Sequence, residues 1–323
     1  MKLRSCVCSL LFAAAAATAA EPAKYPTRPI RIVIPQTPGG ATDLMGRMIG
    51  QMLSERLGVP VVADNRAGSA TIQGSDIAAK SAPDGYTMLI ALPAIAILPA
   101  MSKSLPFDPI KDFVGIMQLC SYPNVVMVNA AVPAASIREL VALAKASPGK
   151  LNYASGGNGS ATHIGVELFK SMAGINLVHV TYKGGGPAII GLIANEVQMY
   201  FNPLPIALPL MSNAKLRVLA VTSLKPSTLL PALPTVSDSG VPGFEQTTWI
   251  GLVVPAKTPP DIIKRLYDVT SEMLKTQAVH ERWAAQGMEV GTIGGQQFTA
   301  LIKSENAKWS RVIKDAGIPP QDF

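Results

Sequence analysis

The sequence predicts an α/β protein built as two lobes. Short apolar runs, typical of buried strands, alternate with amphipathic helical patterns along most of the chain. This alternation breaks near residues 122–123 and again near the run at 249–254. We therefore expect the chain to cross from one lobe to another and back, with a separate sheet in each lobe. The predicted first lobe comprises residues 24–122 plus 247–323, and the predicted second lobe comprises 123–246.

Periodicity and turn residues give the expected order of elements. In the first lobe, strands are expected at 30–34, 59–63 and 86–91, with helices at 42–57 and 72–79. Four prolines at 93, 99, 106 and 109 predict an irregular connection, followed by strands at 114–119 and 125–128 on either side of Pro123. The second lobe is expected to contain helices at 137–146, from about 160 to 172 and up to 194, and strands at 151–154, 177–182, 197–201 and 216–221. A returning strand at 249–254 and helices at 261–274 and 297–314 complete the chain, and this last part is expected to pack on the first lobe.

The amino terminus has the layout of a secretory signal peptide. Lys2 and Arg4 precede an apolar stretch at 7–17, and small residues follow up to Ala20. The apolar stretch is too short for a stable membrane span, although an uncleaved anchor is the alternative. We expect residues 1–20 to be removed near Ala20 and the protein to be exported to the periplasm. Cys120 is then the sole cysteine of the mature chain, so no internal disulfide is expected and a buried packing role is favoured.

Composition argues against several classes of protein. The chain has 28 Lys and Arg residues against 21 Asp and Glu residues, and the basic ones are dispersed without interleaved aromatics. Such a pattern gives no support for nucleic-acid binding and only a weak preference for anions. Because 48% of the residues are hydrophobic and 15% are charged, the sequence indicates a compact globular protein rather than a disordered chain.

Two loops share a design that suits an anionic ligand. In each, an apolar strand runs into a glycine-rich turn that leads into a helix beginning with small or hydroxyl residues, at 37–43 and at 155–163. Glycine allows the backbone to approach a ligand closely, and the free N–H groups of a helix amino terminus favour a carboxylate or phosphate. The alternative is that both are ordinary turns between strand and helix.

Catalytic and cofactor motifs are weak. The run at 157–162 resembles the start of a dinucleotide-binding fingerprint, but Thr162 stands where the third glycine belongs and no acidic residue lies between Glu167 and Glu196. The sequence holds no nucleophile elbow and no phosphate-binding loop ending in Lys and Ser or Thr. Nothing in the sequence pairs a nucleophile with a base, so we expect no catalytic residues and no cofactor.

Three titratable residues have simple expected roles. His163 and Glu167 are four residues apart on a predicted helix, a spacing that suits a shared metal or proton, but no third ligand lies nearby. His163 is therefore expected to form a hydrogen bond near the loop, His179 to be an interior histidine, and Asp43 to complement the helix dipole. We predict no metal site.

Motifs in chain order then carry a resemblance to a known family. Residues 25–30 (YPTRPI) and 38–43 (PGGATD) resemble the start of the Bug-type solute receptors of tripartite tricarboxylate transporters. Further matches are 65–68 (NRAG), 82–87 (APDGYT), 148–155 (PGKLNYAS), 182–184 (YKG) and 233–236 (LPTV). They span nearly all of the predicted mature chain.

The resemblance implies a type II periplasmic-binding-protein fold with a ligand cleft between the lobes. It implies a small carboxylate as ligand, integral-membrane transporter subunits as partners, a monomer, and no catalytic residue or cofactor. Ligand contacts carried over by position, chiefly through backbone amides and hydroxyls, are Thr37, Pro38, Gly39, Gly40, Ala41, Thr42 and Asp43 in the first lobe, and Ser155, Gly156, Asn158, Gly159, Ser160, Ala161 and His163 in the second. Ala91 and Asn202 occupy positions at strand ends that line the pocket in the family.

Departures from the family pattern bear on specificity. Gln36 stands where an aromatic residue is frequent, residues 91–94 (ALPA) replace hydroxyl or amide residues, and Pro203 follows Asn202. The pocket wall is therefore expected to favour an aliphatic or aromatic mono- or dicarboxylate over citrate or an amino acid. Two other functions fit the same sequence, a sensor receptor that presents its ligand to a signalling partner and a secreted enzyme on the same fold.

Overall fold

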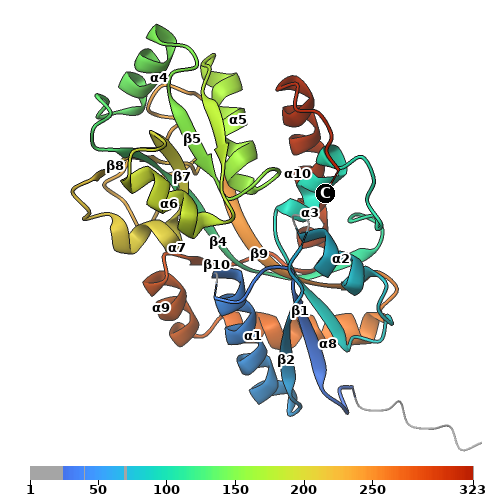
Figure 1. Cartoon of the computed structure of the whole chain (residues 1–323). Coiled ribbons are helices and arrows are strands. Elements are labelled where there is room, and N and C mark those ends of the chain that lie inside the picture. The colour runs from blue at the N-terminus through green and yellow to red at the C-terminus, as the bar shows by residue number, and fades with distance from the viewer. Residues whose placement is uncertain (1–24, 40, 69–70, 323) are drawn as a thin grey trace, which may run out of the picture.

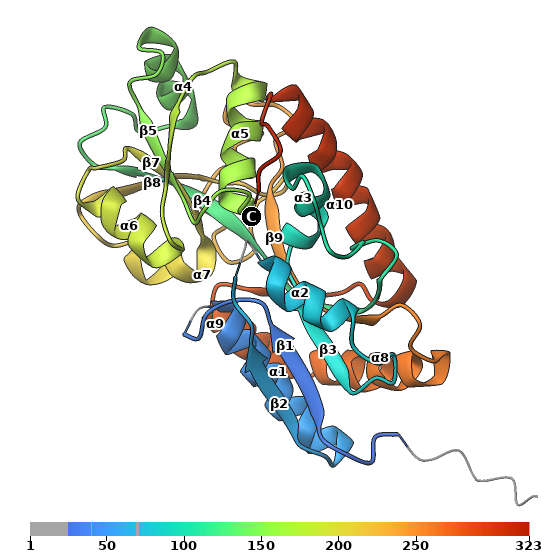
Figure 2. The same cartoon turned by 45° about the vertical axis from the view of Figure 1, so that its right-hand side comes forward.

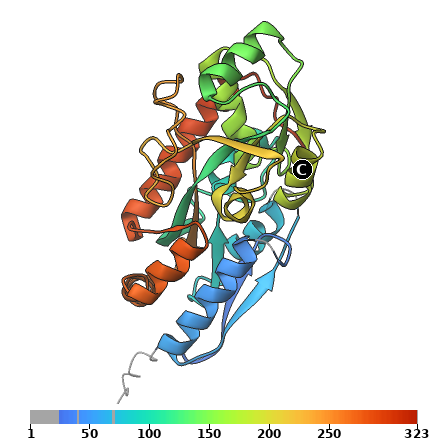
Figure 3. The same ribbon diagram turned by 90° about the vertical axis from the view of Figure 1, so that its left-hand side faces the viewer.

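The computed structural model describes residues 25–39, 41–68 and 71–322 (Figure 1). The predicted signal peptide at 1–20 and the predicted site residue Gly40 lie outside the described residues, as does the side chain of Ala41. Figure 3 shows the blue amino-terminal part of the chain below and the green and yellow part above.

The lower part is a sheet with helices on both faces. Its strands β1 (Ile30–Ile34), β2 (Val61–Asn65) and β3 (Thr87–Ala91) pair in parallel, and β3 pairs antiparallel with β9 (Thr247–Pro255). Buried side chains of α1 (Ala41–Leu57) and α8 (Pro260–Leu274) pack on one face. The helices α2 (Ile72–Ala79), α3 (Ala94–Met101) and α10 (Gly295–Asp315) cover the other face.

The upper part repeats this arrangement with different strands. Here β5 (Asn152–Ser155) pairs in parallel with β6 (Val178–Thr181) and β7 (Met199–Pro203), while β7 and β8 (Leu216–Val221) pair antiparallel with β4 (Phe113–Asn129). Buried residues of α4 (Ile137–Ala146) and α5 (Ala161–Ala173) pack together on one face. The helix α6 (Gly185–Ile193) packs on the other. Four short elements, α7 (Leu204–Ala207), a 3-10 helix (Leu208–Leu210), α9 (Gln277–Ala285) and β10 (Glu289–Val290), complete the described chain.

One long strand corrects two expectations. Residues predicted as separate strands on either side of Pro123 form the single 17-residue strand β4, and hydrogen bonds connect ten described strands in one sheet. The expectation of separate sheets is therefore wrong. Up to Pro123, β4 pairs with β9, and from Asn124 onward it pairs with β7 and β8. Proline cannot donate to a ladder, and here it lies where β4 changes partners, so the strand continues through it.

Two local differences from the predicted elements concern α3 and β2. Residues 94–101 form α3 rather than an irregular connection, even though Pro99 lies inside the helix. The helix buries Ile95, Ile97, Leu98 and Met101, and burial of four large apolar side chains outweighs a lost hydrogen bond. In addition, β2 begins two residues later than expected, which places Asn65 at the end of the strand.

The strand directions place both glycine-rich loops toward the region where β4 and β9 pass between the parts. Because β7 runs antiparallel to β4, its carboxyl end at Pro203 lies opposite Asn124, and the parallel strand β5 ends on the same side. In the lower part, Ala91 at the end of β3 pairs with Gly251, and β1 runs parallel to β3. The carboxyl ends of β1, β3, β5 and β7 therefore all point toward this junction.

The carboxy-terminal helix contacts both parts. Phe298 and Ile302 of α10 pack against the lower sheet, whereas Trp309 and Ile313 pack with α3 and with Ile164 of α5. Figure 2 shows α10 running alongside α3 and α5. The predicted packing on the first lobe is thus observed together with a contact to α5. Within the described ranges, no helix combines the length and apolar character that crossing a bilayer requires.

Candidate functional site

The second glycine-rich loop, residues 155–163, presents unpaired amides at the start of α5. Gly157 and Gly159 have positive φ angles of 132° and 72°, which favour glycine. Ser160 is the N-cap residue and its Oγ accepts from the N–H of His163 at 3.2 Å. The N–H groups of Asn158, Ala161 and Thr162 have no acceptor among the described residues. Together with the positive end of α5, these amides can receive an anion.

The loop after β6 supports the second glycine-rich loop from the side. The N–H of Tyr182 donates to the carbonyl of Ser155 at 3.1 Å, and the N–H of Gly184 donates to the carbonyl of Gly156 at 3.2 Å. A Cβ atom added to Gly156 would lie 3.7 Å from Gly184. The predicted site residues Ser155 and Gly156 are thus held in place by backbone contacts with a neighbouring strand and loop.

Two stacked histidines lie beneath the second loop. The His163 and His179 rings are 4.1 Å apart and nearly parallel, and His179 also stacks on Tyr153 at 4.9 Å. The N–H of Gly159 donates to Nδ1 of His163 at 3.2 Å, as expected for a histidine that forms a hydrogen bond near the loop. Burial, with smaller contributions from His179 and Lys170 and against the opposing effect of Glu167, lowers the pKa of His163 to about 4. His163 is therefore uncharged at neutral pH.

Glu167 is occupied by partners other than histidine. Its carboxylate accepts from the Tyr153 hydroxyl and from Lys170 Nζ, at 2.7 and 2.9 Å for the lysine. Burial, reinforced by Glu167, raises the pKa of Tyr153, which keeps that hydroxyl protonated and donating. No cluster that fits a metal ion occurs among the described residues.

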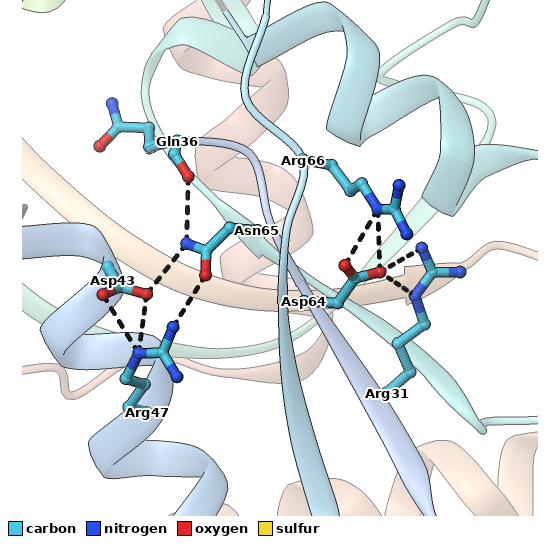
Figure 4. Close-up of polar contacts among 7 residues, drawn as sticks. All are labelled: Arg31, Gln36, Asp43, Arg47, Asp64, Asn65 and Arg66. Atoms are coloured by element: carbon cyan, nitrogen blue, oxygen red, sulfur yellow. Dashed lines mark hydrogen bonds and ion pairs between the residues drawn. The ribbon is translucent and has the colours of Figure 1, made fainter. Parts of the chain in front are cut away.

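The first glycine-rich loop, residues 37–43, contains an anion of its own. Asp43 accepts from the N–H of Gly39 at 2.9 Å. It also accepts from Asn65 Nδ2 at 2.9 Å and pairs with Arg47 Nε at 3.0 Å (Figure 4). Asn65 also donates to the carbonyl of Gln36 at 3.1 Å. Burial alone would raise the pKa of Asp43, but the contacts with Arg47, Gly39 and Asn65 lower it. Asp43 is therefore ionised, as a first-turn acid that complements the helix dipole should be.

The remaining residues of the first loop divide by exposure. Thr37, Pro38 and Gly39 are exposed, whereas Thr42 is buried with an exposed fraction of 4%. The N–H of Thr42 has no acceptor among the described residues. A second carboxylate near this loop, Asp64, is held by Arg31 and Arg66 (Figure 4). The charge of Asp64 is thus balanced by these two arginines, which are not the residues that hold Asp43.

Ala91 and Asn202, the two strand-end residues predicted to line the pocket, are buried. Ala91 is 1% exposed and packs with Val33 and Trp249, and Asn202 is 0% exposed. The Oδ1 atom of Asn202 has no partner within the described residues, and the same holds for Oδ1 of Asn124 and Nε1 of Trp249. These unpaired polar atoms belong to strands β4, β7 and β9 close to the junction.

Several contacts were not predicted from the sequence. Oγ of Ser155 lies 2.6 Å from Nε2 of His179, so the structure does bring a hydroxyl and an imidazole together. Ser155 is 0% exposed and its Oγ also receives the N–H of Gly157 at 3.1 Å, which does not suit a nucleophile that must reach a substrate. The Asp43–Arg47 ion pair could have been predicted, because the two residues are four apart on a helix. The contact between Asn65 and Asp43 could not, because it depends on the pairing of β1 with β2.

With this geometry established, comparison with known proteins identifies the family. Residues 45–318 match the model of the tripartite tricarboxylate transporter family receptor. The chain belongs to this family. It is 35% identical to the protein BugT of Bordetella pertussis over 91% of this chain and 90% of that protein. It is also 32% identical to a Cupriavidus necator protein known as the UPF0065 protein in the gbd 5′ region, over 93% of this chain and 90% of the relative.

Solved structures agree with this assignment. An R. palustris protein solved with adipate has a TM-score of 0.85 and 33% identity, covering 92% of this chain and 100% of that one. The periplasmic binding protein BugD has a TM-score of 0.81 and 29% identity over 92% of this chain and 100% of its own. MatC from Rhodopseudomonas palustris with bound malate has a TM-score of 0.78 and 25% identity over 90% of this chain and 100% of MatC. The α/β fold is therefore the two-lobed fold of periplasmic solute-binding proteins, and the family consists of binding proteins.

Proposed function

We propose that this protein is a periplasmic receptor that captures a small dicarboxylate at the junction and passes it to integral-membrane transporter subunits. The observation that carries the proposal is the placement of the α1 and α5 amino termini, which follow strands that all end toward the junction. Ligands of α/β proteins bind outside the carboxyl ends of the strands, and free amides at a helix amino terminus favour anions.

The proposed ligand site combines both loops. Its contacts are the predicted residues 37–43 and 155–163, with Ala91 and Asn202 nearby. The lobes are proposed to divide between Tyr122 and Pro123, one residue before β4 changes partners, and at Thr247, where β9 begins. Relatives solved with adipate and with malate support a carboxylate ligand, and the unpaired amides of Ala161 and Thr162 suit one.

Export is the second part of the proposal. Residues 1–20 have the features of a signal peptide, so we expect cleavage near Ala20 to release the mature chain. The mature chain is proposed to be a monomer. Amino-terminal sequencing of protein from the periplasmic fraction is expected to begin just after Ala20. Recovery of an uncleaved chain in the membrane fraction would refute the cleavage.

Binding is best tested by thermal unfolding and calorimetry on mature protein refolded without ligand. A carboxylate at about 100 times its dissociation constant should add about 2.7 kcal/mol to the free energy of unfolding, which raises the melting temperature by roughly 5 to 10 °C. Adipate and malate should be compared with adipamide, which has a similar shape and no charge. We expect a shift with a dicarboxylate and none with adipamide, and the absence of a shift across a broad carboxylate panel would refute the proposal.

A further inference from the structure

His179 is a half-buried titratable residue that the proposed function leaves without a role. It lies on β6, outside both glycine-rich loops, yet it contacts the second loop at two places. Nε2 of His179 is 2.6 Å from Oγ of Ser155, where the loop begins, and its ring stacks on His163, which holds Gly159 near the end of the loop. One side chain therefore supports both ends of the loop that presents the free amides.

The hydrogen bonds around Ser155 permit two protonation states of His179. With neutral His179, the Ser155 hydroxyl donates to Nε2 while Oγ accepts from the N–H of Gly157 at 3.1 Å. With protonated His179, Nε2 donates to Oγ, and the hydroxyl proton can turn to the carbonyl of Gly157 at 3.2 Å. Both arrangements keep the Gly157 N–H on Oγ, so the loop backbone need not change when a proton binds.

Charges around His179 decide which state is favoured. Burial lowers the pKa of His179, Lys170 on α5 lowers it further, and Glu167 opposes both. The remaining neighbours, Tyr153 on β5 and His163 on α5, are uncharged at neutral pH, and α6 carries no titratable side chain. The positive end of α5 also disfavours a nearby cation. A bound carboxylate would offset that positive end and would attract a cation at His179.

We propose that His179 is a positioning residue for the second glycine-rich loop and that capture of a carboxylate by this loop favours the protonated form of His179. The inference depends on the proposed function, since it concerns the same loop. Linkage is reciprocal, so an anion that favours proton binding is itself bound more tightly when the proton is present. His179 thereby sets both the shape of the loop and the response of the receptor to mild acid.

Nuclear magnetic resonance of the imidazole Cε1–H groups tests the linkage directly. The chain has three histidines, and the exposed His280 on α9 is an internal control. Saturation with adipate is expected to raise the titration midpoint of His179 by about one pH unit and to leave the resonance of His280 unmoved at each pH. An unchanged His179 midpoint in the saturated protein would overturn the linkage.

Two substitutions test the positioning role at pH 8, where adipate is fully ionised. His179→Phe keeps an aromatic ring for stacking and loses the contact with Ser155, whereas His179→Gln keeps an acceptor for the hydroxyl. We expect about tenfold weaker adipate binding for His179→Phe, a smaller loss for His179→Gln, and no change for His280→Gln. Equal affinity of His179→Phe and the native protein would overturn the positioning role.

A ligand-free measurement separates this inference from the proposed function. The amide resonance of Gly157 should shift in unliganded His179→Phe and remain close to its native position in His179→Gln. An unmoved Gly157 amide in His179→Phe would refute the positioning role whatever the ligand is. If the native protein failed to bind adipate or any other carboxylate, the proposed function would fall, while the Gly157 comparison would still decide whether His179 positions the loop.

Discussion

The two glycine-rich loops share a backbone design and differ in charge. In the first loop, ionised Asp43 already occupies the N–H of Gly39 and is itself held by Arg47 and Asn65. In the second loop, the side chains that occupy backbone amides are neutral, namely Ser155, Ser160, Thr162 and His163. At the proposed site, a ligand carboxylate would therefore meet a resident anion at one loop and uncharged acceptors at the other. We propose from this difference that the ligand charge lies mainly at the second loop.

The largest effect is expected when the second loop receives a charge like that of the first. Ala161 begins α5, and its N–H is free among the described residues. In Ala161→Asp, a carboxylate beside the ligand charge should weaken adipate binding about 100-fold or more, measured by calorimetry. Ser171→Asp is the matched control, since this exposed residue lies in the last turn of the same helix. Unchanged affinity in Ala161→Asp would place the ligand elsewhere.

Acid should destabilise the second loop through His163. Its pKa is about 4 in the folded protein and about 6.5 in an unfolded chain, so between these values the unfolded state binds more protons and stability falls as pH decreases. The stabilising contribution of neutral His163 is fully present above about pH 6.5, and about 3 kcal/mol of it is lost by pH 4. Urea unfolding of the native protein and of His163→Gln should show a stability difference that narrows over this range. A constant difference would contradict the buried neutral state of His163.

How much the sequence could predict depends on how local the cause is. The helix predicted at 137–146 has those bounds in the structure, because its signals are local: Ser136 caps it and its apolar periodicity is strong. The continuation of β4 through Pro123 could not be predicted, because it depends on which strands pair on each side of that proline. The two glycine-rich loops could be predicted from their glycines and from the residues that begin each helix. The contact between Ser155 and His179 could not, because it joins residues 24 positions apart through the pairing of β5 with β6.

Removing the resident anion should make the first loop resemble the second. Asp43→Asn is expected to lower the free energy of unfolding by about 2 kcal/mol at pH 7, because hydrogen bonds to a charged acceptor are lost. The same substitution should strengthen adipate binding about threefold, since a repelling charge near the ligand disappears. Urea unfolding and calorimetry measure the two effects. Asp64→Asn is the control, because its carboxylate pairs with Arg31 and Arg66 outside the loop and should affect stability without strengthening binding. Weaker adipate binding in Asp43→Asn would show that Asp43 assists the ligand rather than competing with it.

The smallest expected effect concerns the choice among carboxylates, which in the proposed site depends on the wall between the two loops. Near the ends of β3 and β7 that wall includes Ala91, Leu92 and Pro203, which offer no side-chain hydrogen-bond donor or acceptor. Each polar ligand group left unpaired against them costs about 1 to 3 kcal/mol, whereas carbon buried there gains about 25 cal/mol per Å². Adipate or terephthalate should therefore bind at least about fivefold more tightly than citrate or glutamate, since about 1 kcal/mol corresponds to that ratio. Competition calorimetry with the four ligands measures the order of affinity. A clear preference for citrate or glutamate would mean that these residues pack behind the pocket and that polar groups elsewhere, such as Oδ1 of Asn202, meet the ligand.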